Sequence, residues 1–121
     1  MQLREMDERV TYLQQLQEDA GPIVLVNVFT VAPEDAERLL EVWADDAAFM
    51  QEQPGFISTQ MHRGTVGSST FVNVAEWESA RALGEAFRSP EFQRRAARYP
   101  DSAVASPHVF KKVAVGGISG A

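Results

Sequence analysis

Apolar stretches with the two-residue period of β-strands alternate along the chain with stretches that follow helical spacing. Ile23 to Val31 is the clearest strand, because Ile, Val and Leu dominate it and both of its faces are apolar. Positions 23, 25, 27, 29 and 31 share one face, and positions 24, 26, 28 and 30 share the other. Helices of so small a chain can cover one face of a sheet. The second face therefore needs another cover, and we expect a second copy of the chain.

The rest of the pattern predicts a short series of further elements. Pro33 is placed to open a helix and Pro54-Gly55 to stop it, while Ser79 is a suitable N-cap for a later helix. The predicted elements are a helix after Pro33, strands at 56–63 and 70–77, helices from Ala80 and from Pro90 to Pro100, and a last strand at about Val109–Val115. The order β-α-β-β-α-β predicts an α+β fold of the ferredoxin-like, split βαβ type. Such a fold has an antiparallel sheet with its helices on one face.

The two ends of the chain have a different character. A helical stripe over residues 3–17 predicts an amphipathic helix that Gly21-Pro22 ends. The stripe consists of Leu3, Met6, Val10 and Leu13. So thin a stripe indicates either contact with a partner subunit or a frayed extension. We expect an N-terminal helical extension at 1–21, an α+β domain at 22–115 and a flexible tail at 116–121.

Length and charge narrow the classes of function. The 121 residues form one domain, and 17 acidic against 11 basic side chains give a formal net charge of -6. This balance repels phosphate backbones and anionic lipid, so we expect neither a nucleic-acid nor a membrane partner. The apolar stretch at 23–29 is too short to span a bilayer, and no secretory leader is recognisable. We therefore expect a cytoplasmic protein.

The usual cofactor motifs are missing. The chain has no cysteine, no Gly-x-Gly-x-x-Gly between a strand and a helix, and no P-loop lysine, since its two lysines are Lys111 and Lys112. His62 and His108 are not spaced as a local metal pair. From these residues we expect neither a metal site nor a conventional redox cofactor.

The positive signal is polar residues inside predicted strands. Asn27 and Asn73 are the only asparagines, and asparagine is depleted in strands. Asn73 and Trp77 bracket the small Ala75 on one face of their strand, which leaves room between two larger side chains. If both asparagines face the helices, two carboxamides and an indole line a cavity. Each buried carboxamide then needs a protein, water or ligand partner.

These residues belong to a longer set of runs that resembles a known family. The runs are Phe29-Thr30-Val31, Gln53-Pro54-Gly55-Phe56-Ile57-Ser58, His62-Arg63, Phe71-Val72-Asn73-Val74-Ala75-Glu76-Trp77-Glu78-Ser79 and Ser89-Pro90-Glu91-Phe92. Together they resemble the antibiotic biosynthesis monooxygenase family over roughly residues 22–115. The resemblance implies a dimeric α+β barrel. It also implies an enzyme that inserts oxygen from O2 into a phenolic or anthrone-type polyketide to give a quinone, with O2 as co-substrate and no metal or flavin.

The resemblance also assigns roles to individual residues. Asn73 and Trp77 match the asparagine and tryptophan of the quinone-forming site, and Asn27 matches a first-strand asparagine found in the haem-degrading branch of the family. His62 lies where such members often carry a histidine, and its reference pKa of about 6.5 suits a base near neutral pH. The residues expected to contact the aromatic substrate are Phe29, Phe71, Met61 and Phe87.

Two departures from the family pattern limit the assignment. The haem-degrading branch needs a histidine shortly after the phenylalanine that matches Phe92, and residues 93–98 contain none. Haem chemistry is therefore disfavoured. Ala82-Leu83-Gly84 stands where some quinone-forming members place a tyrosine proton relay. Two other functions thus remain open: a non-catalytic dimer that binds an aromatic ligand, and a polyketide cyclase or isomerase of the same fold.

Overall fold

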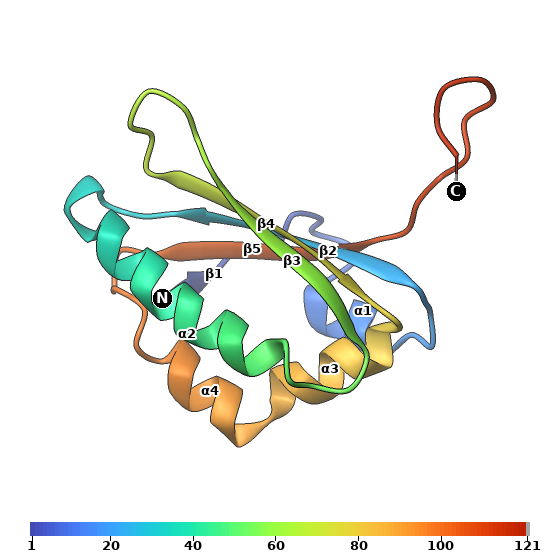
Figure 1. Ribbon diagram of the computed structural model, residues 1–121, viewed down its shortest axis with the longest axis horizontal. Helices are drawn as coiled ribbons and strands as arrows, with labels where there is room; N and C mark the ends of the chain where they lie inside the picture. The colour runs from blue at the N-terminus through green and yellow to red at the C-terminus, as the bar shows by residue number, and fades with distance from the viewer. Residues whose placement is uncertain (121) are drawn as a thin grey trace.

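The computed structural model describes residues 1–120 and contains a curved, mainly antiparallel sheet with helices packed on one side (Figure 1). In chain order the elements are β1 (Gln2–Leu3), α1 (Tyr12–Gln17), β2 (Ile23–Thr30), the 3-10 turn η1 (Pro33–Asp35), α2 (Ala36–Met50), β3 (Phe56–Arg63), β4 (Thr70–Trp77), α3 (Ala80–Arg88), α4 (Pro90–Ala96) and β5 (Val104–Phe110). None of these helices is long and apolar enough to cross a bilayer.

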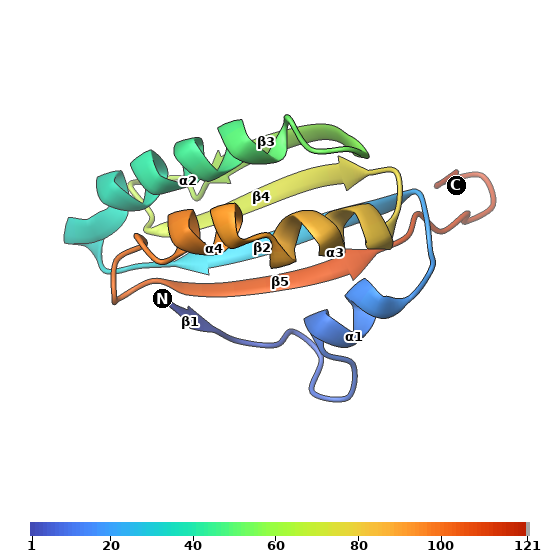
Figure 2. The same ribbon diagram turned by 90° about the horizontal axis from the view of Figure 1, so that it is seen from below.

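Within residues 1–120 the five strands form one sheet in the order β1-β5-β2-β4-β3. The four longer strands pair in antiparallel fashion, with β2 between β4 and β5. Helices α2, α3 and α4 all lie over the same face of this sheet (Figure 2). The predicted α+β, ferredoxin-like arrangement is confirmed.

Local sequence signals set the ends of several elements. Pro33 opens η1 directly before α2, and the Ser79 hydroxyl caps α3 by accepting a hydrogen bond from the Ala82 backbone N–H at 3.0 Å. Gly55 turns the chain between α2 and β3 with a φ of +87°, and a Cβ there would lie 2.5 Å from the Ala82 Cβ. Only glycine fits this conformation and this close approach.

The last strand lies earlier in the sequence than predicted. We expected a loop up to residue 108 and a strand at about Val109–Val115, whereas β5 runs from Val104 to Phe110. Pro107 made this stretch resemble a loop, but it pairs with Asn27 inside the sheet. The two-residue β1 covers only the start of β5, at Val104 and Ala105. Pro107 lies beyond β1 on the outer edge of β5, where no strand within residues 1–120 pairs with it and its missing N–H is tolerated.

The N-terminal helix predicted over residues 3–17 is wrong in extent and in the face it buries. Only Tyr12–Gln17 is helical, and Thr11 begins it with a capping box that includes Gln14. The four residues of the predicted stripe are 40–55% exposed. The buried residues of α1 are Tyr12 and Leu16 instead. The start of the chain adds to the free edge of β5 as β1, so tertiary pairing overrides the local helical pattern.

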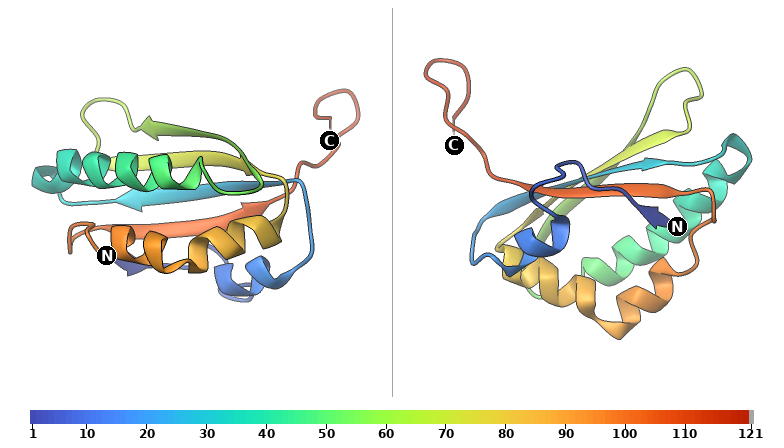
Figure 3. Two further views of the ribbon diagram at one scale, coloured as in Figure 1. Left: turned by 60° about the horizontal axis from the view of Figure 1, so that its bottom comes forward. Right: turned by 180° about the vertical axis from the view of Figure 1, so that it is seen from behind.

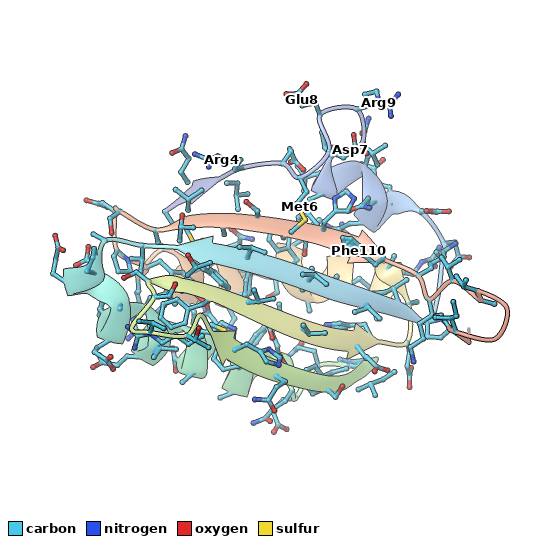
Figure 4. The ribbon with its side chains drawn as sticks, turned by 90° about the horizontal axis from the view of Figure 1, so that it is seen from above. Arg4, Met6, Asp7, Glu8, Arg9 and Phe110 are labelled. Atoms are coloured by element: carbon cyan, nitrogen blue, oxygen red, sulfur yellow. The ribbon has the colours of Figure 1, made fainter. Side chains whose placement is uncertain are left out.

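The N-terminal segment packs on its own domain. Tyr12 and Leu16 belong to one hydrophobic cluster with Leu83 of α3, and α1 lies beside α3 (Figure 3). Seen from the sheet face opposite the helices, Asp7, Glu8 and Arg9 project away from the sheet at the β5 edge, and Met6 points toward β5 (Figure 4). The segment is therefore a wall of the domain.

At the other end of the chain, residues 115–119 close a small turn in which Val115 and Ser119 form an isolated bridge. Residue 121 of the expected flexible tail lies outside the described residues.

Candidate active site

The helix-facing side of the sheet carries two hydrophobic clusters in place of one continuous core. One cluster includes Trp77 and Leu83, and the other includes Phe29, Leu39 and Phe71. Members of both clusters line a cavity of about 350 Å³ between the sheet and the helices. This volume falls in the range of about 300–1,000 Å³ that is typical of small-molecule sites.

Two carboxamides form the middle of the cavity floor. Asn27 on β2 and Asn73 on β4 are direct cross-strand neighbours, and both line the cavity. Both therefore share the helix-facing side of the sheet, which meets the condition that the sequence analysis set for a cavity lined by two carboxamides. The Oδ1 atom of Asn27 is buried and has no hydrogen-bond partner within residues 1–120. An unpartnered buried acceptor costs about 1–3 kcal/mol, so this atom is suited to accept a hydrogen bond from a bound molecule.

The Asn73 amide is held in one orientation by its neighbour on β3. The Thr59 hydroxyl donates a hydrogen bond to Asn73 Oδ1 at 2.5 Å, and Thr59 also lines the cavity. This bond uses one of the two acceptor positions of the amide oxygen and fixes the orientation of the amide. The Nδ2 group of Asn73 is then the part of the side chain that can donate to a ligand.

Trp77 lies at the end of β4 and completes the polar part of the cavity. Its side chain is 1% exposed, lines the cavity, and meets Phe56 edge-to-face with the ring centroids 5.5 Å apart. Ala75 lies between Asn73 and Trp77 on the same face and also lines the cavity. The small side chain of Ala75 leaves the space that the sequence pattern predicts between the two larger ones.

Two of the four predicted substrate contacts lie at the cavity and two do not. Phe29 and Phe87 line it. Phe71 is fully buried in the second hydrophobic cluster, with the Arg63 guanidinium 5.1 Å from its ring centroid. Met61 is half-buried against the same cluster. Neither Phe71 nor Met61 is among the residues that line the cavity.

His62 lies outside the cavity, contrary to the role expected for it. It is exposed on β3, and its Nδ1 atom is 3.2 Å from the Val72 carbonyl oxygen. The reason is a register shift between Phe56 and Ser58. Because a bulge adds one residue, Phe56 and Thr59 both face the cavity and His62 falls on the opposite face of the sheet.

An acidic residue that the sequence analysis overlooked faces the cavity. Asp46 is 4% exposed, and neither of its carboxylate oxygens has a hydrogen-bond partner within residues 1–120. Burial raises the pKa of this carboxyl from 3.8 to about 6. The Tyr99 hydroxyl, Arg95 and Arg98 oppose that rise, and Asp45 adds to it. Tyr99 does not reach hydrogen-bonding geometry on either oxygen.

The sequence does contain a signal for Asp46. The residue follows Val42 by four positions and precedes Met50 by four, so it falls on the apolar stripe of α2. Tyr12, from the N-terminal segment, also lines the cavity, and burial raises the pKa of its hydroxyl. Within residues 1–120, no group of three or more His, Asp or Glu side chains is placed to hold a metal ion.

The fold and the cavity place the chain in a known class. Residues 22–98 match the antibiotic biosynthesis monooxygenase family, and the chain belongs to this family. The N-terminal segment up to residue 21 lies outside the matched region. One relative of this chain is named as a monooxygenase and another is described as an oxygenase.

Individual relatives support this placement. Over 74 residues the chain is 36% identical to deoxynogalonate monooxygenase of Streptomyces nogalater, a match that covers 61% of this chain and 62% of that protein. The crystal structure of SnoaB from the same organism, described as a cofactor-independent oxygenase, is 29% identical with a TM-score of 0.69 and covers 81% of this chain and 99% of SnoaB. Rv0793 from Mycobacterium tuberculosis shares the fold at 16% identity, with a TM-score of 0.66 over 80% of this chain and 100% of that one.

Proposed function

We propose that the protein is a cofactor-independent monooxygenase that inserts one oxygen atom from O2 into a phenolic or anthrone-type polycyclic substrate and forms a quinone. The observation that carries the proposal is the convergence of Asn27, Asn73 and Trp77 on one cavity that separates two hydrophobic clusters. The similarity to deoxynogalonate monooxygenase and to the cofactor-independent SnoaB supports the reaction class.

Each of the three polar residues has a distinct role in this proposal. The unpartnered Asn27 Oδ1 accepts a hydrogen bond from a substrate hydroxyl and so orients the planar substrate in the cavity. The Asn73 amide, held by Thr59, donates to the substrate oxygen that becomes negative when the substrate loses a proton. The Trp77 indole N–H is a second neutral donor beside it. A preorganised donor of this kind lowers a barrier by about 3–4 kcal/mol.

The apolar walls of the cavity hold the substrate and exclude water. An electron-rich anion can transfer an electron to O2 directly, and the resulting radical pair can combine to a peroxide that loses water. Phe29 and Phe87 give the cavity flat, apolar sides. They hold the ring system and keep bulk water from the reacting carbon.

The test is O2 uptake by metal-stripped protein supplied with 1,8-dihydroxyanthrone, with quinone formation followed by absorbance. Uptake matched by quinone supports the proposal. Product formed without O2 uptake indicates a cyclase or isomerase, and binding without conversion indicates an aromatic-ligand-binding protein. Either of these two results contradicts the proposed oxygenation.

Two variants connect the activity to the cavity. Asn73→Ala removes the oriented amide, and Trp77→Phe removes the indole N–H while an aromatic ring remains. Each should lower kcat by about 10²–10³. Glu41→Gln, a change of an exposed side chain on α2 that does not line the cavity, is the control and should leave kcat unchanged. Wild-type turnover in both cavity variants would refute the assignment of these residues.

A further inference from the structure

Asp46 lies at a buried position of α2 where the other residues of the same stripe are apolar. The other buried residues of α2 are Ala36, Leu39 and Val42, and Asp46 continues their stripe one turn further. Its side chain is 4% exposed and lines the cavity. Neither of its oxygens has a hydrogen-bond partner within residues 1–120. A buried carboxylate without partners destabilises a fold, so a structural role does not account for it.

The nearby cations pair with the adjacent residue instead. Arg95 and Arg98 contact the carboxylate of Asp45 at 2.9 Å and 2.7 Å. No lysine, arginine or histidine is among the residues that line the cavity. Asp45, Arg95 and Arg98 are the charged groups near Asp46, and Tyr99 is the other titratable side chain that faces it. Asp46 is thus the only charged side chain among the cavity-lining residues that the structure describes.

We propose that Asp46 is the general base of the cavity and accepts the proton that the substrate loses before it reacts with O2. The inference rests on the proposed function. A cavity whose only charged side chain is a carboxylate disfavours entry of a substrate that is already anionic. The substrate therefore enters neutral and is ionised in place. Proton transfer to Asp46 keeps the total charge in the cavity constant, because the negative charge moves from the carboxylate to the substrate.

The charge then lies beside groups that can stabilise it. The substrate oxygen faces the Asn73 amide and the Trp77 indole, whereas neither oxygen of Asp46 has a partner in hydrogen-bonding geometry within residues 1–120. Burial, which raises the pKa of Asp46 to about 6, makes it a stronger proton acceptor than an exposed aspartate. Both effects favour transfer of the proton in the direction that the reaction needs.

The whole reaction balances with Asp46 unchanged at its end. Asp46 takes a proton from the reacting CH2 group, and the electron pair of that C–H bond stays on the substrate. The anion forms a C–O bond with O2, and the terminal peroxide oxygen takes the proton back from Asp46. Loss of water, which carries away the second hydrogen of the carbon, leaves a carbonyl. One oxygen atom of O2 is in the quinone and the other is in water.

The test compares pH profiles of O2 uptake with 1,8-dihydroxyanthrone for the wild type, Asp46→Asn and Glu41→Gln, after subtraction of the spontaneous rate. Glu41 is the matched control, since it is an exposed carboxylate on the same helix. The wild type and the control should lose about tenfold in kcat/KM per pH unit below about pH 6. Asp46→Asn should lower kcat by about 10²-fold or more and abolish this acidic limb. Near-normal turnover of Asp46→Asn with the acidic limb intact overturns the inference while the proposed function stands.

A binding measurement separates the two proposals if the wild type consumes no O2. Alizarin is a flat dihydroxyanthraquinone whose colour changes when it ionises, so its pKa can be followed when bound. If Asp46 and the bound phenol share one negative charge, the apparent pKa of bound alizarin should be higher in the wild type than in Asp46→Asn by about one unit or more. Equal values overturn the role of Asp46. Failure of alizarin to bind the wild type overturns both proposals.

Discussion

Replacement of Asp46 by asparagine should stabilise the folded protein, and the gain should depend on pH. The carboxyl is buried and unpartnered, and its pKa is raised from 3.8 to about 6. Between these two values the folded state binds more protons at this site than the unfolded state. Stability contributed by the group therefore falls as the pH rises through this window, and the loss is complete above about pH 6.

The size of the effect follows from the shift. Two pKa units correspond to about 3 kcal/mol that the charged carboxylate takes from the folded state at neutral pH. The same linkage gives a loss of about 1 kcal/mol at about pH 4.5. Asp46→Asn removes the ionisation and keeps the shape. Its stability relative to the wild type should therefore rise by about 2 kcal/mol between about pH 4.5 and about pH 7.5.

Urea unfolding followed by tryptophan fluorescence measures this difference, because Trp77 is buried and Trp43 also lines the cavity. Protein concentration is held constant so that any self-association contributes equally. Glu41→Gln serves again as the control and should show no pH-dependent gain. A stability difference for Asp46→Asn that is flat across this range, or negative at neutral pH, would refute the reasoning that the carboxylate is buried and unpaired.

Four further changes probe other parts of the structure. Thr59→Val removes the hydroxyl that orients Asn73, and we expect about a tenfold loss of kcat without loss of substrate binding, measured by steady-state kinetics; unaltered kcat would contradict this role. His62→Ala should keep wild-type kcat, because His62 lies on the opposite face of the sheet from the cavity, and a large loss would show that it acts in catalysis. Leu16→Ala should lower the free energy of unfolding by about 2–5 kcal/mol in urea titrations, and a negligible loss would mean that the N-terminal segment is not part of the core. We propose that the sheet face without helices packs against a second copy, and Val74→Glu puts a charge on this face. Light scattering should show a dimer for the wild type and a monomer for the variant. A monomeric wild type would contradict the proposal.

The alternation of side chains in the two central strands predicted part of the cavity lining. The pattern at 23–31 and at 70–77 showed which residues share a face with Asn27 and which with Asn73, and left open whether both faces are covered by helices. In the structure the two asparagines are cross-strand neighbours and both line the cavity. Alternation is robust in these strands because their pairing has no irregularity. The spacing from Asn73 to Trp77 likewise predicted the gap at Ala75.

The bulge in β3 shows where such reasoning fails. A register shift between Phe56 and Ser58 exchanges the two faces of the strand for every later residue. No residue type at this position signals the extra residue. Thr59 therefore reaches the cavity and His62 does not.

The N-terminal segment and β5 could not be predicted for a related reason. The free edge of β5 accepts the start of the chain as β1, and such long-range pairing leaves no trace in local spacing. Asp46 differs from both cases. Its position on the apolar stripe of α2 was visible in the sequence. An acidic residue at such a position is normally interpreted as a break in the stripe, and only the structure shows that Asp46 is buried.

The most direct test of oxygen insertion is the fate of labelled O2. Metal-stripped protein is incubated with 1,8-dihydroxyanthrone under oxygen-18 gas in ordinary water, and the quinone is analysed by mass spectrometry. A second incubation exchanges the labels between gas and water. We predict one labelled atom in the quinone in the first case and none in the second. A quinone whose new oxygen comes from water, or one that forms equally well without O2, would contradict the account.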